Sequence, residues 1–432
     1  MMTGDAAGRP VGDDMFARIM RGLGPWLPDG PDAVPVAIAV SGGADSLALA
    51  LLARRWRQAV VGLVVDHGLR AESAAEAAQT VRRLARMDIP ARLLRLEGLS
   101  RGSRMAERAR HMRYQALVTA CRELGAIDLL VGHHAGDQAE TVMMRRRAAS
   151  GPDGLAGMAR AVTGNDVRLV RPLLDIAKSD LYATLRHAGM DWVEDPSNAD
   201  LRTERARARA ALARDVGLRD RMLRVVRAAG RRRMRHEEED ALWLARHARF
   251  HAGGWVELPA RLPCAHIMSA LIRTVGGREY VPSRPGVAAL CEHPRAATLG
   301  GTRLMAYKGG WLLLREEAAM EGQVPAHAGV RWDNRFVLRP SDGGCPLPAS
   351  LWVGAAGAVA AWWPRDRARP VMPARALRTL PALHHDGHVV AVPHMGVFAP
   401  GLPHGWCFAF VPPVPVTPGG CFGVPAQIPR PV

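Results

Sequence analysis

A glycine-rich turn near the N-terminus has the residue types of a phosphate-binding loop. It consists of Ser41, Gly42, Gly43, Ala44, Asp45 and Ser46, and it lies between a predicted strand and a predicted helix. Glycines let the backbone approach a phosphate closely, and the first N–H groups of the helix point at it with the positive end of the helix dipole. The lysine of the Walker A pattern is absent, so the loop is not of that type. The alternative is a structural turn in which Asp45 or Ser46 caps the helix.

Two carboxylates further along the chain share one face of a predicted helix. Asp137 and Glu140 are three residues apart, and Thr141 follows on the same face. Such a pair can hold an ammonium group or accept a proton from an amine nucleophile. The alternative is that both residues complement the helix dipole from its first turn.

Histidine and arginine side chains extend the candidate site. His133 and His134 follow one predicted strand, and Asp66 and His67 follow another. Neighbouring side chains on an extended segment point apart, so the adjacent histidines do not suit a zinc site, and we predict no metal site built from side chains. Arg110 can reach a phosphate or form a solvated ion pair within its helix.

The elements that must position these residues alternate between strands and helices. Apolar runs predict strands at 34–40, 60–65, 91–96 and 128–131, and helical spacing predicts helices at 46–58, 71–87 and 104–124. This alternation predicts an α/β fold with a doubly wound parallel sheet. Ligands bind at the carboxyl ends of such strands, so the polar residues that follow them are expected to converge on one crevice.

The rest of the chain predicts further domains, because 432 residues exceed one ordinary hydrophobic core. A stretch rich in Ala and Arg at 201–235 predicts helix, and short β-like runs occur at 331–338 and 388–392. The tail is dense in proline and glycine, which predicts disorder. We therefore expect an N-terminal extension at 1–30, a nucleotide-binding catalytic domain at 31–212, a helical basic domain at 213–325, a small C-terminal domain containing strands at 326–410, and a tail at 411–432.

The net charge favours a polyanionic partner such as nucleic acid. The formal charge is +17 at pH 7, and the 58 basic residues include only two lysines, Lys178 and Lys308. Basic side chains that neutralise phosphates release counterions and gain affinity, and arginine offers phosphate a planar fork of donors. The predicted contacts are Arg145, Arg146, Arg205, Arg207 and Arg209. A solvated helix face is the alternative for each of them.

Cysteine usage and hydropathy predict a cytoplasmic protein without a membrane partner. The six cysteines form no Cys-x-x-Cys pair, which argues against a zinc ribbon and a thioredoxin-like motif. No apolar run is long enough to cross a bilayer, and the N-terminus lacks the apolar region of a secretory signal.

Seven short motifs follow one another along the chain. They are SGGADS at 41–46, VDHGLR at 65–70, ERARHMRY at 107–114, GHHAGDQAET at 132–141, GLAGM at 154–158, RPLL at 171–174 and WVEDPSN at 192–198. In this order they resemble the tRNA(Ile)-lysidine synthase family of the PP-loop, or N-type ATP pyrophosphatase, superfamily. WDNRF at 332–336 is a weaker match to the start of that family's C-terminal domain.

This resemblance implies a PP-loop fold, similar to adenine nucleotide α-hydrolases, and a ligase reaction in two steps that forms a carbon–nitrogen bond. ATP adenylates the C2 oxygen of the wobble cytidine in an isoleucine tRNA with a CAU anticodon, and pyrophosphate leaves. The ε-amine of free L-lysine then attacks C2 and expels AMP, which leaves lysidine in the anticodon. Mg²⁺ is expected to accompany ATP.

The resemblance also implies roles for single residues. The loop at 41–46 would bind ATP together with Asp66, His67, Arg110 and His133. Asp45, Asp137 and Glu140 would be catalytic, and the last two would also bind lysine. The five predicted arginines would contact tRNA.

Two positions depart from the family's pattern, and other functions stay open. Gly136 stands where the usual motif HHADDQAET has its first Asp, and Glu204–Arg205 stands where the family tends to carry Arg-Asn. A tRNA thiolase would need a persulfide-forming cysteine or an iron–sulfur cluster, and only Cys121 lies in the first domain. A non-catalytic tRNA-binding protein is the other alternative, against which the three intact carboxylates argue. The sequence does not decide between a monomer and a homodimer.

Overall fold

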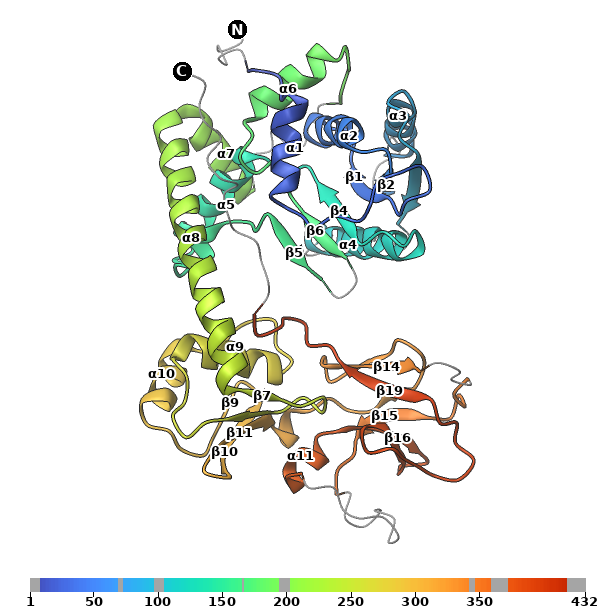
Figure 1. The fold of residues 1–432 in the computed structure, drawn as a ribbon, viewed down its shortest axis with the longest axis vertical. Helices are drawn as coiled ribbons and strands as arrows, with labels where there is room; N and C mark the ends of the chain where they lie inside the picture. Colours follow the sequence, from blue (N-terminus) through green and yellow to red (C-terminus); the bar gives the residue numbers. More distant parts are fainter. Residues whose placement is uncertain are drawn as a thin grey trace. The chain divides into compact units, whose positions relative to one another are not determined.

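The chain folds into two compact units. The computed structural model describes residues 8–68, 73–96, 105–164, 167–193, 203–341, 346–358 and 372–417, without the side chains of Ala106 and Glu107. One unit runs to His236 and the other from Glu237 to Pro418, so the boundary falls within the long helix α8 (Val216–His247) (Figure 1). Residues 1–7 of the expected extension and 418–432 of the expected tail lie outside the described residues.

A six-stranded sheet forms the centre of the first unit, with the strand order β3-β2-β1-β4-β6-β5. The strands are β1 (Val36–Val40), β2 (Val60–Asp66), β3 (Ala91–Arg95), β4 (Asp128–Val131), β5 (Ala161–Thr163) and β6 (Arg168–Val170). All neighbouring strands are parallel except β5, which runs antiparallel to β6. The predicted α/β fold with a parallel sheet is confirmed.

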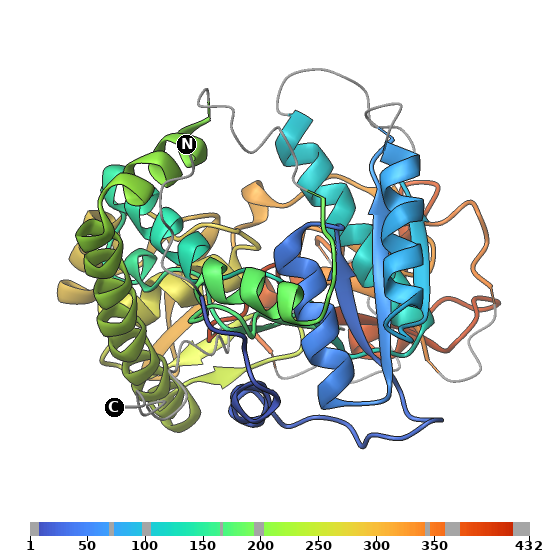
Figure 2. The ribbon, with the colours of Figure 1, turned by 90° about the horizontal axis from the view of Figure 1, so that it is seen from above.

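Helices cover both faces of this sheet. The helices that precede α8 in this unit are α1 (Asp13–Arg21), α2 (Ala44–Trp56), α3 (Ser73–Ala85), α4 (Met105–Glu123), α5 (Ala135–Arg147), α6 (Lys178–His187) and α7 (Glu204–Arg214), with a short 3₁₀ turn at Gly154–Ala156. Of these, α6 packs against α2 and α7 packs against α5. Side chains of β1 alternate between the faces: Val36 and Ile38 pack in a core shared with α1, α2 and α6, whereas Ala37 and Ala39 pack in a core shared with α4. Helix α1 is seen end-on in Figure 2.

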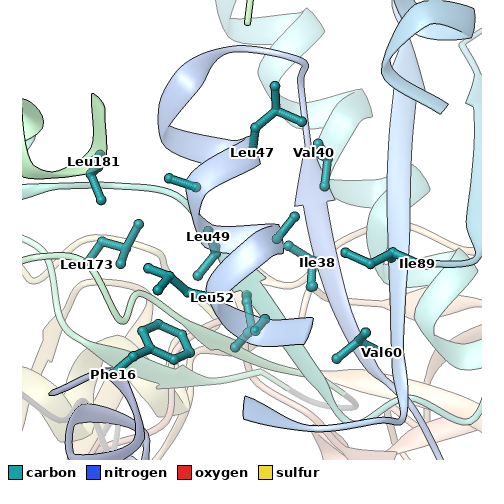
Figure 3. Close-up of a cluster of buried hydrophobic side chains, with 14 of the residues drawn as sticks. Phe16, Ile38, Val40, Leu47, Leu49, Leu52, Val60, Ile89, Leu173 and Leu181 are labelled. Atoms are coloured by element: carbon teal, nitrogen blue, oxygen red, sulfur yellow. The ribbon is translucent and has the colours of Figure 1, made fainter. Parts of the chain in front are cut away.

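Helix α6 lies against α2, the helix that follows the glycine-rich turn. Figure 3 shows Leu181 of α6 and Leu173 beside Leu49 and Leu52 of α2, and all four side chains are buried. This apolar contact fixes the N-terminal part of α6 relative to α2. A segment about 130 residues from the turn is thereby held near it.

The sheet order places the candidate site at a switch point. β1 pairs with β2 on one side and with β4 on the other, because the chain runs from β1 through β2 to β3 and then crosses over to β4. Ligands bind at the carboxyl ends of strands at such a point. The glycine-rich turn after β1 and His133–His134 after β4 both lie there.

The second unit contains three antiparallel sheets. Their strand orders are β7-β8-β11-β10-β9, β12-β15-β16-β17-β18 and β13-β14-β19. The strands are β7 (Arg249–Phe250), β8 (Val256–Leu258), β9 (Ala297–Leu299), β10 (Thr302–Tyr307), β11 (Gly310–Arg315), β12 (Val324–Pro325), β13 (Arg331–Trp332), β14 (Phe336–Pro340), β15 (Trp352–Ala355), β16 (Pro381–His385), β17 (His388–Val392), β18 (Val397–Phe398) and β19 (Trp406–Phe410). The helices are α9 (Ala265–Val275), α10 (Arg284–Glu292) and α11 (Ala374–Arg378), with 3₁₀ turns at Glu317–Ala319 and Pro393–Met395.

Tight turns explain where these strands differ from the sequence pattern. The domain expected to be helical, at 213–325, also contains the first of the three sheets. In this sheet, Lys308 and Gly309 form the turn of the β10–β11 hairpin, with φ of 47° and 76°. The run at 331–338 is a hairpin rather than one strand, because Asp333 and Asn334 adopt φ of 52° and 53°. Within the described residues, no helix is both long enough and apolar enough to cross a membrane.

Candidate active site

The glycine-rich turn is closed by its own serines and leaves the following helix uncapped. The Ser41 amide donates to Ser46 Oγ at 3.1 Å, and that hydroxyl donates to the Gly43 carbonyl at 3.0 Å. Gly42 has φ of 84°, and a Cβ there would lie 2.4 Å from Thr80 Oγ1, so glycine is required. Gly43 is the N-cap residue of α2, and no side chain caps that helix. The first amides of α2 are therefore suited to an anion.

Asp45 presents a carboxylate oxygen without a partner. Its Oδ1 is buried and accepts no hydrogen bond from the described residues, and its Oδ2 lies 3.7 Å from His134 Nε2. Burial raises the pKa of Asp45, although His134 and Lys178 oppose that effect. A carboxylate whose buried oxygen has no hydrogen-bond donor destabilises the free protein and is suited to a cationic ligand.

His134 and Asp137 cap helix α5 together. The Gly136 amide donates to His134 Nδ1 at 2.9 Å, and the His134 amide donates to Asp137 Oδ2 at 3.0 Å. A Cβ at Gly136 would lie 2.6 Å from His134 Cε1. Glycine at this position therefore allows the His134 ring to lie between Asp45 and Asp137, at 3.7 and 3.6 Å from their carboxylates.

We predict that Gly136→Ala moves the His134 ring with little net change in stability. The lost cap costs about 1 kcal/mol, and alanine in the first turn of a helix returns up to about 1 kcal/mol of helix propensity. Denaturant unfolding should show a nearly unchanged midpoint, whereas the His134 ring signals in an NMR spectrum should shift. An unchanged His134 signal would contradict the geometry described here.

The two carboxylates of α5 are bound by two arginines of α7. Arg205 donates to Asp137 Oδ1 at 2.5 Å and to Glu140 Oε2 at 2.8 Å, and Arg209 donates to Glu140 Oε1 at 2.7 Å. Both carboxylates are buried, while the arginine side chains are partly exposed. Burial alone would raise the pKa of Asp137, but His134 and Arg205 bring it below its ordinary value. The cluster thus combines two anionic groups with two cationic groups.

The histidines at the strand ends are neutral and lack partners for one ring nitrogen. Nδ1 of both His67 and His133 is buried and makes no hydrogen bond to a described residue. Burial lowers the pKa of both rings, that of His133 to about 4. Asp66 instead accepts hydrogen bonds from the Ser73 hydroxyl at 2.6 Å and the Gly68 amide at 3.0 Å, which is the turn-capping arrangement.

Sequence reasoning missed two arginines beside the predicted Arg110. Arg110 is exposed with its guanidinium 5.3 Å from the Tyr114 ring centroid, and Arg113 lies 6.0 Å from the same centroid. Arg171 is buried, lies near Tyr114 and donates to the Ala159 carbonyl at 2.8 Å. Burial lowers the pKa of both Arg113 and Arg171. Their place in the motifs at 107–114 and 171–174 was the available signal.

The predicted nucleic-acid contacts do not form one group. Arg145 donates to the Gly154 and Gly157 carbonyls, each at 2.8 Å, and so holds the turn after α5. Arg205 and Arg209 are bound to the α5 carboxylates, as described above. Arg146 and Arg207 are exposed on their helices. Of the five, Arg146 and Arg207 are the most accessible to a phosphate backbone.

Comparisons with known proteins identify relatives of this chain. The PP-loop domain family matches residues 21–216. A tRNA(Ile)-lysidine synthase from Ruegeria pomeroyi is 34% identical over 387 residues, which cover 85% of this chain and 89% of that protein. Another from Hyphomonas neptunium is 37% identical over 321 residues, which cover 66% of this chain and 86% of that protein.

Solved structures resemble the chain more distantly. A U34-tRNA thiolase from Methanococcus maripaludis matches with a TM-score of 0.42 and 17% identity, over 50% of this chain and 78% of the thiolase. An NH3-dependent NAD synthetase from Campylobacter jejuni matches with a TM-score of 0.30 and 14% identity, over 50% of this chain and 89% of that chain.

Proposed function

We propose, from the premise that this chain belongs to the tRNA(Ile)-lysidine synthase family, that it uses ATP to join lysine to the wobble cytidine of an isoleucine tRNA. The family resemblance predicted from the seven motifs is confirmed. The observation that carries the proposal is the convergence of an uncapped phosphate loop and a cluster of opposite charges at the switch point of one parallel sheet. The proposed class is a ligase that forms a carbon–nitrogen bond.

The residues present fit ATP and its metal ion. The free first-turn amides of α2 suit the phosphates, and the unpartnered ring nitrogens of His67 and His133 suit polar groups of the nucleotide. Among the described residues no three His, Cys, Asp or Glu side chains are grouped to hold a metal, so Mg²⁺ would be held by phosphate oxygens with Asp45 Oδ1 as a protein ligand. The ion would neutralise phosphate charge as pyrophosphate leaves.

The charge cluster between α5 and α7 supports lysine as the second substrate. Free lysine is a zwitterion with one carboxylate and two ammonium groups. Asp137 and Glu140 offer acceptors for an ammonium group, and Arg205 and Arg209 offer donors for a carboxylate. The attacking ε-amine must be neutral, and Asp137, whose pKa is below its ordinary value, is ionised and able to accept a hydrogen bond from it.

Adenylation and transfer then follow in order. The C2 oxygen of the cytidine attacks the α-phosphorus, and the bond to pyrophosphate breaks. The ε-amine forms a bond to C2, the C2–O bond breaks, AMP departs with the oxygen, and the amine loses its protons to the carboxylate cluster or to water. The proposed location is the cytoplasm.

Sulfur transfer is not favoured. Cys121 belongs to the core beside α4, is fully buried, and burial raises the pKa of its thiol to about 11. The thiolate needed to carry a persulfide is therefore unavailable to a bound nucleotide.

The assay that tests the proposal incubates the full chain with ATP, lysine and an isoleucine tRNA with a CAU anticodon. We expect AMP release that requires all three and incorporation of labelled lysine into the RNA. AMP release that ignores lysine, or incorporation of sulfur from a sulfur donor, would overturn the proposal. Sedimentation of the same sample tests the homodimer, which stays a prediction.

A further inference from the structure

The phosphate loop lacks the lysine of a Walker A motif, but the fold brings a lysine to it from another segment. Lys178 is the first residue of α6, and it is one of only two lysines among 58 basic residues. Two residues before it, the Ile176 carbonyl accepts a hydrogen bond of 3.0 Å from the amide of Ala135, the first residue of α5. The beginning of α6 is therefore held at the edge of the crevice.

A chain of contacts connects Lys178 with the loop itself. The Lys178 ammonium lies 5.3 Å from the ring centroid of Tyr182, one turn later in α6. The Tyr182 ring stacks on Trp192 with centroids 5.0 Å apart and an interplanar angle of 11°. The next residue, Val193, donates its amide to the Gly42 carbonyl at 3.3 Å. The aromatic pair thus positions the lysine relative to the glycine turn.

Lys178 is charged and accessible. Burial would lower its pKa, but the Asp45 carboxylate and the Tyr182 hydroxyl raise it above its ordinary value. Its side chain is nevertheless exposed, so an incoming anion can reach the ammonium group. Asp45 is one of the residues of the phosphate loop, so the charge of Lys178 acts on the place where ATP phosphates are proposed to bind.

We infer that Lys178 binds the β- and γ-phosphates of ATP beside the loop at 41–46 and holds the pyrophosphate as it leaves. This inference rests on the proposed function. An ammonium group on a flexible stem can follow a phosphate group that moves away from the reacting phosphorus, whereas a guanidinium prefers a fixed planar geometry. The Walker A lysine has a comparable task, but here the residue comes from α6, a helix that packs against α2.

The test compares ATP with AMP, which lacks the two phosphates in question. Calorimetric titration of the full chain in Mg²⁺ should show that Lys178→Met weakens ATP binding by about 10- to 100-fold, as expected for loss of a charged hydrogen bond, and leaves AMP binding unchanged. Lys178→Arg should restore part of the ATP affinity. Thermal unfolding of each variant establishes that it is folded.

Lys308 provides a matched control. Its ammonium lies 5.1 Å from the ring centroid of Tyr307, so Lys308→Met removes the same charge and the same type of aromatic contact from the second unit. This variant should bind both nucleotides like the parent chain. Equal losses for ATP and AMP in Lys178→Met, or no loss for either, would overturn the inference. A parent chain that binds no ATP would instead overturn the proposed function.

Discussion

Replacing Asp45 with asparagine is expected to slow adenylation of the RNA by about 100-fold or more, while the variant stays folded and binds tRNA. The carboxylate stands in the first turn of α2, and its buried Oδ1 makes no hydrogen bond to a described residue. Such an oxygen contributes little to the free protein. Its proposed partner is the metal ion that accompanies the phosphates, and the neutral amide of asparagine binds such an ion more weakly than a carboxylate does.

The same substitution should leave stability unchanged or raise it. The pKa of Asp45 is higher in the folded chain than the ordinary value of 3.8, because burial penalises its charged form. Protonation therefore favours the folded state, and the ionised group becomes destabilising as the pH rises from the ordinary pKa through the folded one. At neutral pH this penalty is fully present, and asparagine removes it. Lost activity with retained stability would identify a carboxylate kept for function.

Two measurements and a control test the Asp45 prediction. Exchange of pyrophosphate into ATP in the presence of tRNA reports adenylation, and thermal unfolding reports stability. Asp13→Asn changes an exposed carboxylate in the first turn of α1, whose partner is Arg55 at 3.5 Å, and should alter neither. Undiminished exchange in Asp45→Asn would mean that the loop is structural, and a lower unfolding temperature would mean that Asp45 stabilises the fold.

The fold and the phosphate loop were predictable because their signals are local. The strand at Val36–Val40 is a continuous apolar run, as expected for a parallel strand buried on both faces, and the glycine turn follows it directly. Helical spacing likewise places Asp137 and Glu140 on one face of α5. In each case the pattern and the structural consequence lie within a few residues of each other.

Contacts between segments that are distant in the sequence were not predictable in this way. Arg205 lies 68 residues after Asp137, and no periodicity indicates that α7 packs against α5 and neutralises its carboxylates. Composition did single out Lys178, but only the packing of α6 on α2 brings it to the phosphate loop. The hairpin formed by Thr302–Tyr307 and Gly310–Arg315 lies in a region that was predicted to be helical. The local sequence feature that indicates this hairpin is the turn between its two strands.

The substitution Glu140→Gln is expected to raise the KM for lysine by about 10- to 100-fold and to leave the rate of pyrophosphate exchange near that of the parent chain. Glu140 is 3% exposed, and its carboxylate binds Arg205 at 2.8 Å and Arg209 at 2.7 Å. An amide oxygen can accept from one of these groups but cannot balance two cations or an incoming ammonium group. The substitution therefore separates lysine transfer from adenylation.

Stability should fall by less than the roughly 3–5 kcal/mol typical of a broken buried ion pair, because both arginines are partly exposed and stay hydrated. Glu123→Gln is the control, since Glu123 forms an exposed ion pair with Arg92 at the surface. That variant should keep the parent KM for lysine. If Glu140→Gln lowers exchange as strongly as lysine transfer, Glu140 acts on the nucleotide step or on the packing of α7. If it lowers neither, the ammonium group of lysine binds elsewhere, and the arginine-bound cluster is a structural contact between α5 and α7.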